Sequence, residues 1–288
     1  RRRTLNSIKI KIADTGIAIK KKVTQFNIKA MKAMKISVIA LCFILIAEKV
    51  SAQEYKITVQ NPKNTRVILK NFNGQLPIEG YGGNDIVITS TYGRYEPPEK
   101  AKGLKPIFPG GADNTGIGLD VEKTDKIITI TCLIPFTQEG EYKIRMPESA
   151  TIEVSSDCER ANHVSIKGMK NELDIETCYD IELKDVTGPL VLASNGNIDV
   201  TFSTINTTKP SSVQSVTGDI DITMPVNTPV SLELSTGSGA FYSDFDFTDI
   251  KKDLKIIGGN ELRYDLNGGG FKFNIGSISG NIFLRKGD

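Results

Sequence analysis

The stretch HVSIKGMKNELDIETCYDIELKDVTGPLVLASNGNIDV, residues 163–200, decides the fold. Within it, pairs of apolar residues separated by one other residue recur every eight or nine positions. The pairs are Val164/Ile166, Leu173/Ile175, Ile181/Leu183, Leu190/Leu192 and Ile198/Val200. Period-two alternation interrupted by polar turns indicates short β-strands, and every second pair repeats at 17 residues. A fixed repeat of such units predicts a β-solenoid, in which each coil stacks on the previous one and shares its core.

The same turn-and-strand phrase returns further along the chain. Residues 194–200, 217–222 and 279–284 each contain Gly, then Asn or Asp, then an alternating strand. Glycine adopts backbone conformations that other residues avoid, and Asn or Asp bonds to the nearby backbone of a turn. We therefore predict an all-β fold over 53–288, built as a single-stranded, β-helix-like stack of short strands.

An irregular segment interrupts this pattern at 93–118. It holds four Pro and six Gly in 26 residues, which excludes a regular element. Loops of this length are usually functional, and this one combines aromatic with polar side chains. We take Tyr95, Phe108 and Asn114 as candidate binding residues. The alternative is an insertion that covers one side of the solenoid.

Residues 31–52 have the order of a secretory signal peptide. A short basic stretch precedes the almost wholly apolar segment 36–47, and Val50 and Ala52 then occupy positions −3 and −1 of a cleavage site before Gln53. The apolar segment has twelve residues, whereas a membrane-spanning helix needs about 20. We therefore expect cleavage between Ala52 and Gln53 and no stable membrane span afterwards.

The net charge of +2 hides an uneven distribution. Residues 1–52 hold 12 of the 36 Lys and Arg but 2 of the 34 Asp and Glu, which leaves 53–288 with a net charge of −8. An acidic domain disfavours nucleic acid and anionic membranes as partners. We interpret the basic residues 1–30 as an upstream extension that is not part of the fold. The alternative is a basic amphipathic membrane segment.

Three cysteines follow the expected cleavage site. Cys132 lies on the apolar face of an alternating strand, which suits a small core residue. Cys158 and Cys178 could pair, although their spacing alone leaves this open, and an odd number leaves at least one cysteine unpaired. Because the chain has a single His, His163, and no C-x-x-C motif, we expect no Cys/His metal site and no cofactor.

Two groups of acidic residues suggest other functions. Asp199, Asp219 and Asp221 alternate with apolar residues and should project outward, where stacked coils could bring Asp199 near the other two. Neighbouring strands lie ~4.8 Å apart, and glycoside hydrolysis uses two carboxyl groups roughly 5–9.5 Å apart, so the spacing permits a glycan-cleaving site. The three acids of 244–249 could hold Ca²⁺, but they lack the Gly-flanked twelve-residue loop of a strong calcium site, and Phe245 and Phe247 alternate with them as in an ordinary strand with Phe inward.

Several phrases in a fixed order give the chain a family resemblance. They are residues 103–106, 113–119, 170–175, 186–192, 217–222, 241–245 and 279–287. Over most of 54–287 the chain resembles the secreted "putative adhesin" domain family of Gram-negative bacteria, which has no established activity. The resemblance implies a right-handed β-solenoid-like fold at the cell surface or in the periplasm. It brings no catalytic motif.

These observations favour a non-catalytic, exported binding or adhesion protein. We expect it in the periplasm or on the outer surface of a Gram-negative cell, with a glycan or a surface protein as its partner. One alternative is a polysaccharide-active β-helix enzyme, and another is a purely structural envelope component. The residues leave the ligand and the oligomeric state open.

Overall fold

The computed structural model describes residues 53–91, 99–102, 104, 110–135, 141–156, 158, 160, 162–247 and 260–287. The expected signal peptide and the segment before it lie outside these residues, as does Ala52. Within the described part the fold is all-β, with only two short 3₁₀ turns, η1 (Pro62–Asn64) and η2 (Glu99–Ala101). No helix of the described part is both long and apolar enough to cross a membrane.

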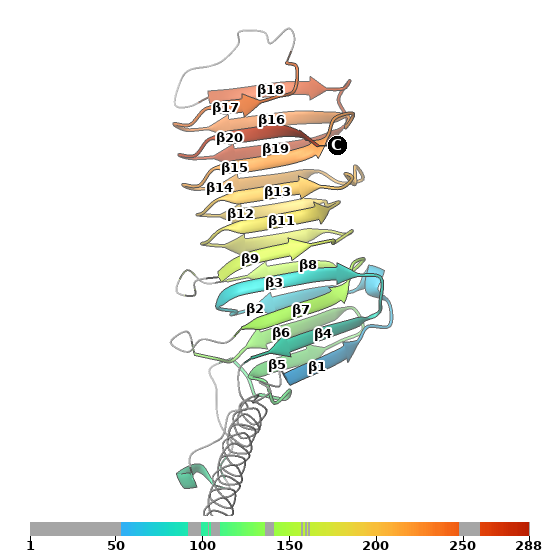
Figure 1. Ribbon diagram of the computed structural model, residues 1–288, viewed down its shortest axis with the longest axis vertical. Helices are drawn as coiled ribbons and strands as arrows, with labels where there is room; N and C mark the ends of the chain where they lie inside the picture. Colours follow the sequence, from blue (N-terminus) through green and yellow to red (C-terminus); the bar gives the residue numbers. More distant parts are fainter. Residues whose placement is uncertain are drawn as a thin grey trace, which may run out of the picture. The chain divides into compact units, whose positions relative to one another are not determined.

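The strands form two ten-stranded sheets, each mostly parallel (Figure 1). The first sheet runs, in spatial order, β1 (Gln53–Thr58), β4 (Asp85–Ser90), β7 (Tyr142–Pro147), β3 (Gly74–Tyr81), β9 (Asn162–Lys167), β11 (Ile181–Val186), β13 (Ile198–Phe202), β15 (Ile220–Pro225), β20 (Ile282–Gly287) and β17 (Phe241–Ser243). The second runs β18 (Asn260–Leu266), β16 (Val230–Thr236), β19 (Phe271–Ser277), β14 (Ser211–Ser215), β12 (Leu190–Ser194), β10 (Leu173–Thr177), β8 (Thr151–Ser155), β2 (Arg66–Lys70), β6 (Ile127–Cys132) and β5 (Leu119–Lys123).

The middle of the stack follows the register that the repeat predicts. From β8 to β15 successive strands alternate between the two sheets. Ile181 pairs in register with Val164 on one side and with Ile198 on the other, each 17 residues away. In the second sheet Leu173 pairs with Leu190, again at a separation of 17. The 17-residue period is therefore the separation between parallel neighbours within one sheet.

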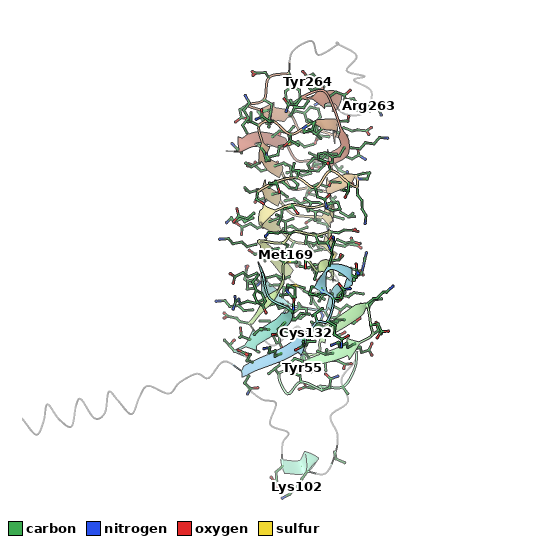
Figure 2. All side chains as sticks on the ribbon, turned by 90° about the vertical axis from the view of Figure 1, so that its right-hand side faces the viewer. Tyr55, Lys102, Cys132, Met169, Arg263 and Tyr264 are labelled. Atoms are coloured by element: carbon green, nitrogen blue, oxygen red, sulfur yellow. A yellow bond between two sulfur atoms is a disulfide. The ribbon has the colours of Figure 1, made fainter. Side chains whose placement is uncertain are left out.

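Both sheets turn their apolar side chains toward one continuous core. The predicted core residues Ile181, Leu183, Ile198 and Val200 are at most 2% exposed, and the intervening residues face outward. Cys132 is also buried, as its apolar strand face suggests. Figure 2 labels Met169, a fully buried core residue, midway along the stack. The period-two alternation is thus confirmed as a core-facing pattern.

The two ends of the stack depart from sequential order. At one end β16 and β17 do not pair with β14 and β15; the final strands β19 and β20 lie between them. In Figure 1 β19 and β20, in the red of the C-terminus, lie within the stack and not at its edge. At the other end β2 lies between β6 and β8, and β3 between β7 and β9. Antiparallel edge strands β1, β5 and β18 complete three of the four sheet edges.

The turns that join the two sheets are linked by a series of hydrogen bonds, which we call the turn ladder. In each rung a buried or half-buried Ser or Thr hydroxyl accepts the N–H of a glycine in its own turn and donates to the glycine carbonyl of the adjacent turn. The hydroxyls belong to Ser215, Ser277 and Thr236, and the glycines in spatial order are Gly196, Gly218, Gly280 and Gly239. This ladder explains why the turn phrase recurs, since each copy must hold the next.

A second ladder runs beside it. The side-chain oxygen of Asn197 accepts the backbone N–H of Asp219 at 2.9 Å, and the carboxylate of Asp219 accepts the backbone N–H of Asn281 at 2.7 Å. The expectation that Asp219 projects from the outer strand face is therefore wrong. Asp219 lies in the turn before β15 and bonds the neighbouring turn.

Candidate functional site

Two side chains organise the end of the 93–118 loop: Asp113 bonds within the loop, and Asn114 bonds to β5. The Asp113 carboxylate accepts the backbone N–H groups of Thr115, Gly116 and Gly118 at 2.8–3.1 Å. The Asn114 amide donates to the carbonyl of Val121 and accepts its N–H, both at 2.9 Å, in the manner of a paired strand. The Asn114 amide is thus engaged in attaching the loop to β5.

The other residues proposed for this loop cannot be placed with it. Tyr95 and Phe108 lie outside the described residues. Asn114 donates a further hydrogen bond to the Asp120 carboxylate at 3.0 Å. The structure therefore assigns Asn114 a local structural contact.

A different surface gathers polar and aromatic side chains in register on the outer face of the first sheet. Two rows cross the parallel strands β9, β11, β13, β15 and β20. One row is Ser165, Glu182, Asp199, Asp221 and Phe283, and the other is Lys167, Lys184, Thr201, Thr223 and Arg285. Each of these residues is exposed or half-buried. We call these ten residues, together with Tyr242 of β17, the ladder face.

The expected approach of Asp199 to a second carboxylate occurs here. Asp199 and Asp221 are register partners on adjacent strands. Asp221 accepts hydrogen bonds from the Arg285 guanidinium at 2.7–2.9 Å, whereas Asp199 makes no hydrogen bond or ion pair with the described residues. The two carboxylates thus have different surroundings although they occupy equivalent positions.

The environment of Asp199 opposes its ionisation. Partial burial, followed by the negative charges of Asp221 and Glu182, raises the pKa of the Asp199 carboxyl above its ordinary value. Lys184 acts in the opposite direction but is paired with Glu182 on its own strand. The middle of the ladder face therefore holds a carboxylate whose charge is poorly compensated.

The ladder face ends in a stacked aromatic pair. Tyr242 and Phe283 lie on the adjacent strands β17 and β20, with ring centroids 5.1 Å apart and planes 13° apart. The Arg285 guanidinium lies 5.7 Å from the Phe283 centroid. Tyr242 is 53% exposed, and it is the one aromatic residue among the exposed large hydrophobic residues of the described part. Nothing in the sequence marks the two as partners, because they lie 41 residues apart in the chain and share no motif.

A polar hollow of about 460 Å³ lies on the second sheet near the same end. Its charged lining residues are mostly paired with neighbours: Glu233 accepts from Arg263 at 2.7 Å, and Asp265 from Ser231 at 2.5 Å. Figure 2 labels Arg263 and Tyr264 of this region on the edge strand β18. Asn274 also lines the hollow, which makes it a useful reference position for binding experiments.

Two of the acids considered as Ca²⁺ ligands, Asp244 and Asp246, make other contacts. Asp244 accepts the backbone N–H of Lys286 at 2.8 Å, and the Lys286 ammonium lies 3.6 Å from Asp246. The third acid, Asp249, lies outside the described residues. Within the described part no three His, Cys, Asp or Glu residues converge as metal ligands, and His163 faces Asp180 at 3.6 Å.

The cysteines separate into a pair and a single buried thiol. Cys158 and Cys178 form a disulfide, which the sequence left open. Cys132 is free and buried in the core. Burial raises the pKa of the Cys132 thiol, which makes it a poor nucleophile and suits a packing role.

Comparisons with known proteins are sparse. No protein-family model and no curated protein matches this chain. Two solved structures resemble it over 82% of its length at 12% sequence identity. One is a "putative cell adhesion protein" from Clostridium sporogenes ATCC 15579, with a TM-score of 0.38 over 100% of that chain. The other is a "putative adhesin" from Bacteroides fragilis NCTC 9343, with a TM-score of 0.33 over 97% of that chain.

Both names are consistent with the family resemblance seen in the sequence. At such identities and scores the likeness carries no argument about function. The function of this chain has to be inferred from its own residues and their contacts.

Proposed function

We propose that this chain is an exported, non-catalytic binding protein of the periplasm or outer surface of a Gram-negative cell. It contacts its partner through the ladder face. The observation that carries the proposal is the exposed, stacked pair Tyr242 and Phe283 beside the charged pair of Arg285 and Asp221. Rigid aromatic rings next to oriented polar groups are a common composition of binding surfaces, because they lose little conformational entropy on contact.

Export is supported by two independent features. The order of basic, apolar and small residues in 31–52 is that of a signal peptide. The disulfide between Cys158 and Cys178 is the kind of bond that persists in oxidising compartments. A chain that remained in the reducing cytosol would gain nothing from either feature.

The proposed architecture is a right-handed solenoid with two strands in each coil. The alternation of strands between two sheets, with parallel neighbours 17 residues apart, supports coiling. Connections between parallel strands are right-handed in nearly all proteins. A rigid scaffold of this kind presents side chains at fixed intervals, which suits extended partners.

The direct test is binding of the purified full chain to an array of glycans and surface-matrix proteins. The proposal expects at least one specific ligand, whose binding falls at least tenfold in Tyr242→Ala and Phe283→Ala. Glu176→Ala is the matched control, because Glu176 projects from β10 of the second sheet. If both aromatic variants keep their fold, as measured by circular dichroism, and still bind the ligand, the contact surface lies elsewhere on the protein.

We propose the 93–118 loop as a second surface that contacts the partner, through Tyr95, Phe108 and Asn114. Because Asn114 attaches the loop to β5 and Asp113 holds the turn at Gly116, the informative variant replaces residues 96–109 with a short Gly-Ser linker and leaves both contacts intact. Loss of binding in a folded variant supports a loop contact. Unchanged binding assigns recognition to the ladder face alone.

One observation favours a second function, a polysaccharide-cleaving enzyme. Asp199 has a raised pKa and lies in register with the Arg285-paired Asp221, and two carboxyl groups in different environments are the usual glycosidase arrangement. Product analysis by mass spectrometry after incubation with the bound glycan separates the two functions. Released fragments that disappear in Asp199→Asn would establish cleavage. If the array yields no ligand at all, a purely structural envelope role is left.

A further inference from the structure

We infer that the ligand of the ladder face is a neutral, linear, β-linked glycan that lies across the strands, one sugar unit to each strand. The inference rests on the proposed function and specifies its partner. It follows from three properties of the ladder face: its spacing, its charge balance and its aromatic end.

The spacing favours a glycan over an extended peptide. Adjacent strands are ~4.8 Å apart, so equivalent groups along either row recur at this interval. A pyranose unit in an extended, β-linked chain is only slightly longer than this interval, so successive sugars stay close to equivalent groups over the few strands of the ladder face. An extended peptide repeats its side-chain pattern every two residues, or about 6.6 Å, and would lose register within two strands.

The charge balance favours a neutral ligand. The ladder face has three carboxylates, from Glu182, Asp199 and Asp221, and three cationic groups, from Lys167, Lys184 and Arg285. A polyanion or polycation would meet repulsion from half of these charges. A sugar hydroxyl both donates and accepts hydrogen bonds, so it can use either row.

Each of the central strands offers this choice of partner. Strand β11 presents Glu182 and Lys184, β13 presents Asp199 and Thr201, and β15 presents Asp221 and Thr223. The two residues on one strand lie two positions apart, about 6.6 Å. An acceptor and a donor at this separation can engage hydroxyls on opposite sides of one sugar ring. Asp199 is the best placed, because no described residue uses its carboxylate.

The aromatic end supplies a stacking surface for the chain terminus. Tyr242 is on β17, which pairs with β20 and is the last strand of the first sheet among the described residues. The Tyr242 ring is 53% exposed and stacked on Phe283. The apolar C–H face of a pyranose packs against such a ring, which gains from burying both surfaces.

The test measures affinity against ligand length. The full chain is titrated calorimetrically with β-1,4-linked oligosaccharides of glucose, mannose and N-acetylglucosamine, each with two, four and six units. Every additional strand adds polar contacts worth about 0.5–1.5 kcal/mol each. We therefore expect at least one series to bind about tenfold more tightly for every two units added.

Variants locate the ligand on the ladder face. Asp199→Ala should weaken the four- and six-unit ligands at least fivefold, and Tyr242→Ala should weaken all lengths. Two controls should bind as wild type: Glu176→Ala on the second sheet, and Asn274→Ala in the polar hollow. Asp199→Asn keeps the side-chain size and serves as the second variant if the alanine form melts early.

The outcomes separate this inference from the function on which it rests. Absence of binding by every oligosaccharide, or affinity independent of length, overturns the glycan assignment. A loss in Asn274→Ala without a loss in Asp199→Ala overturns the location. If the array instead returns a protein ligand that depends on Tyr242, the proposed binding function holds and the inference fails. If the array returns nothing, both fail.

Discussion

Replacing Gly218 with alanine tests whether the turn ladder holds neighbouring turns of the stack together. Gly218 is buried, and an added methyl group would overlap the backbone carbonyl group of Gly196 in the neighbouring turn. Backbone cannot rotate away as a side chain can, so the two turns must separate. Their separation breaks the hydrogen bonds between the two turns.

The magnitude follows from the bonds at this step. Between the two turns, the Ser215 hydroxyl donates to the Gly196 carbonyl at 2.8 Å, the Thr217 hydroxyl to the Asn195 carbonyl at 2.6 Å, and the Asp219 N–H to the Asn197 side chain at 2.9 Å. Three hydrogen bonds at about 1 kcal/mol each amount to about 3 kcal/mol. Alanine restricts the unfolded chain and returns about 0.4–1 kcal/mol. We expect a net loss of about 2–3 kcal/mol.

Urea unfolding monitored by circular dichroism measures this loss as a lower midpoint at unchanged slope. The matched control is Gly82→Ala, because a methyl group at Gly82 meets nothing within 4 Å. The control should be neutral or slightly stabilising. A surface substitution changes stability by less than about 0.5 kcal/mol. If the stability of Gly218→Ala differs from that of Gly82→Ala by no more than this, the turn ladder does not couple neighbouring turns and the reasoning is wrong.

Four further predictions concern the core, the ladder face, the disulfide and export. In urea melts Ile198→Asp should lose several kcal/mol, because it buries an unpaired charge, whereas Asp199→Ala should be nearly neutral; equal losses would contradict the register. The pKa of Asp199 is raised in the folded chain, first by partial burial and then by Asp221, so its ionisation costs stability as pH rises. Asp199→Asn should therefore melt above wild type at pH 7 and together with it at pH 3, and the reverse order would refute the assignment. Replacing Cys158 and Cys178 with serine opens a 20-residue loop and should lower stability by about 3 kcal/mol, measured under non-reducing conditions; an unchanged midpoint would deny the bond a stabilising role. Mass spectrometry of exported protein should find an N-terminus at Gln53, and a mature chain that retains residues 36–47 would exclude the signal peptide.

The sequence alone determines the strands and their buried faces. A period of two fixes which side chains point inward, and a slip of one residue would bury the polar set. This is why the stretch 163–200 predicts both the strands and the 17-residue register that the structure has. The same logic predicts that Asp199 and Asp221 project from the same face, because both alternate with core residues in equivalent turn-and-strand phrases.

The candidate site is less visible in the sequence. The pairing of Asp199 with Asp221 could be anticipated from the repeat, but the proximity of Tyr242 to Phe283 could not, since nothing in either local sequence marks them as partners. Asp219 shows the opposite error. Alternation assigned it to the strand face, but a turn carboxylate competes for backbone N–H groups of the next turn, and it bonds Asn281 instead.

Only the tertiary structure decides the order of the strands at the C-terminal end. Strands β19 and β20 enter between β14/β15 and β16/β17, although residues 230–243 precede them in the chain. The backbone hydrogen bonds that join strands are chemically the same for every sequence, so alternation specifies a face without specifying a neighbour. The choice is made by contacts between turns: Ser277 and Asn281 fit the turn at Gly218 and Asp219, and such long-range contacts exist only once the chain has folded.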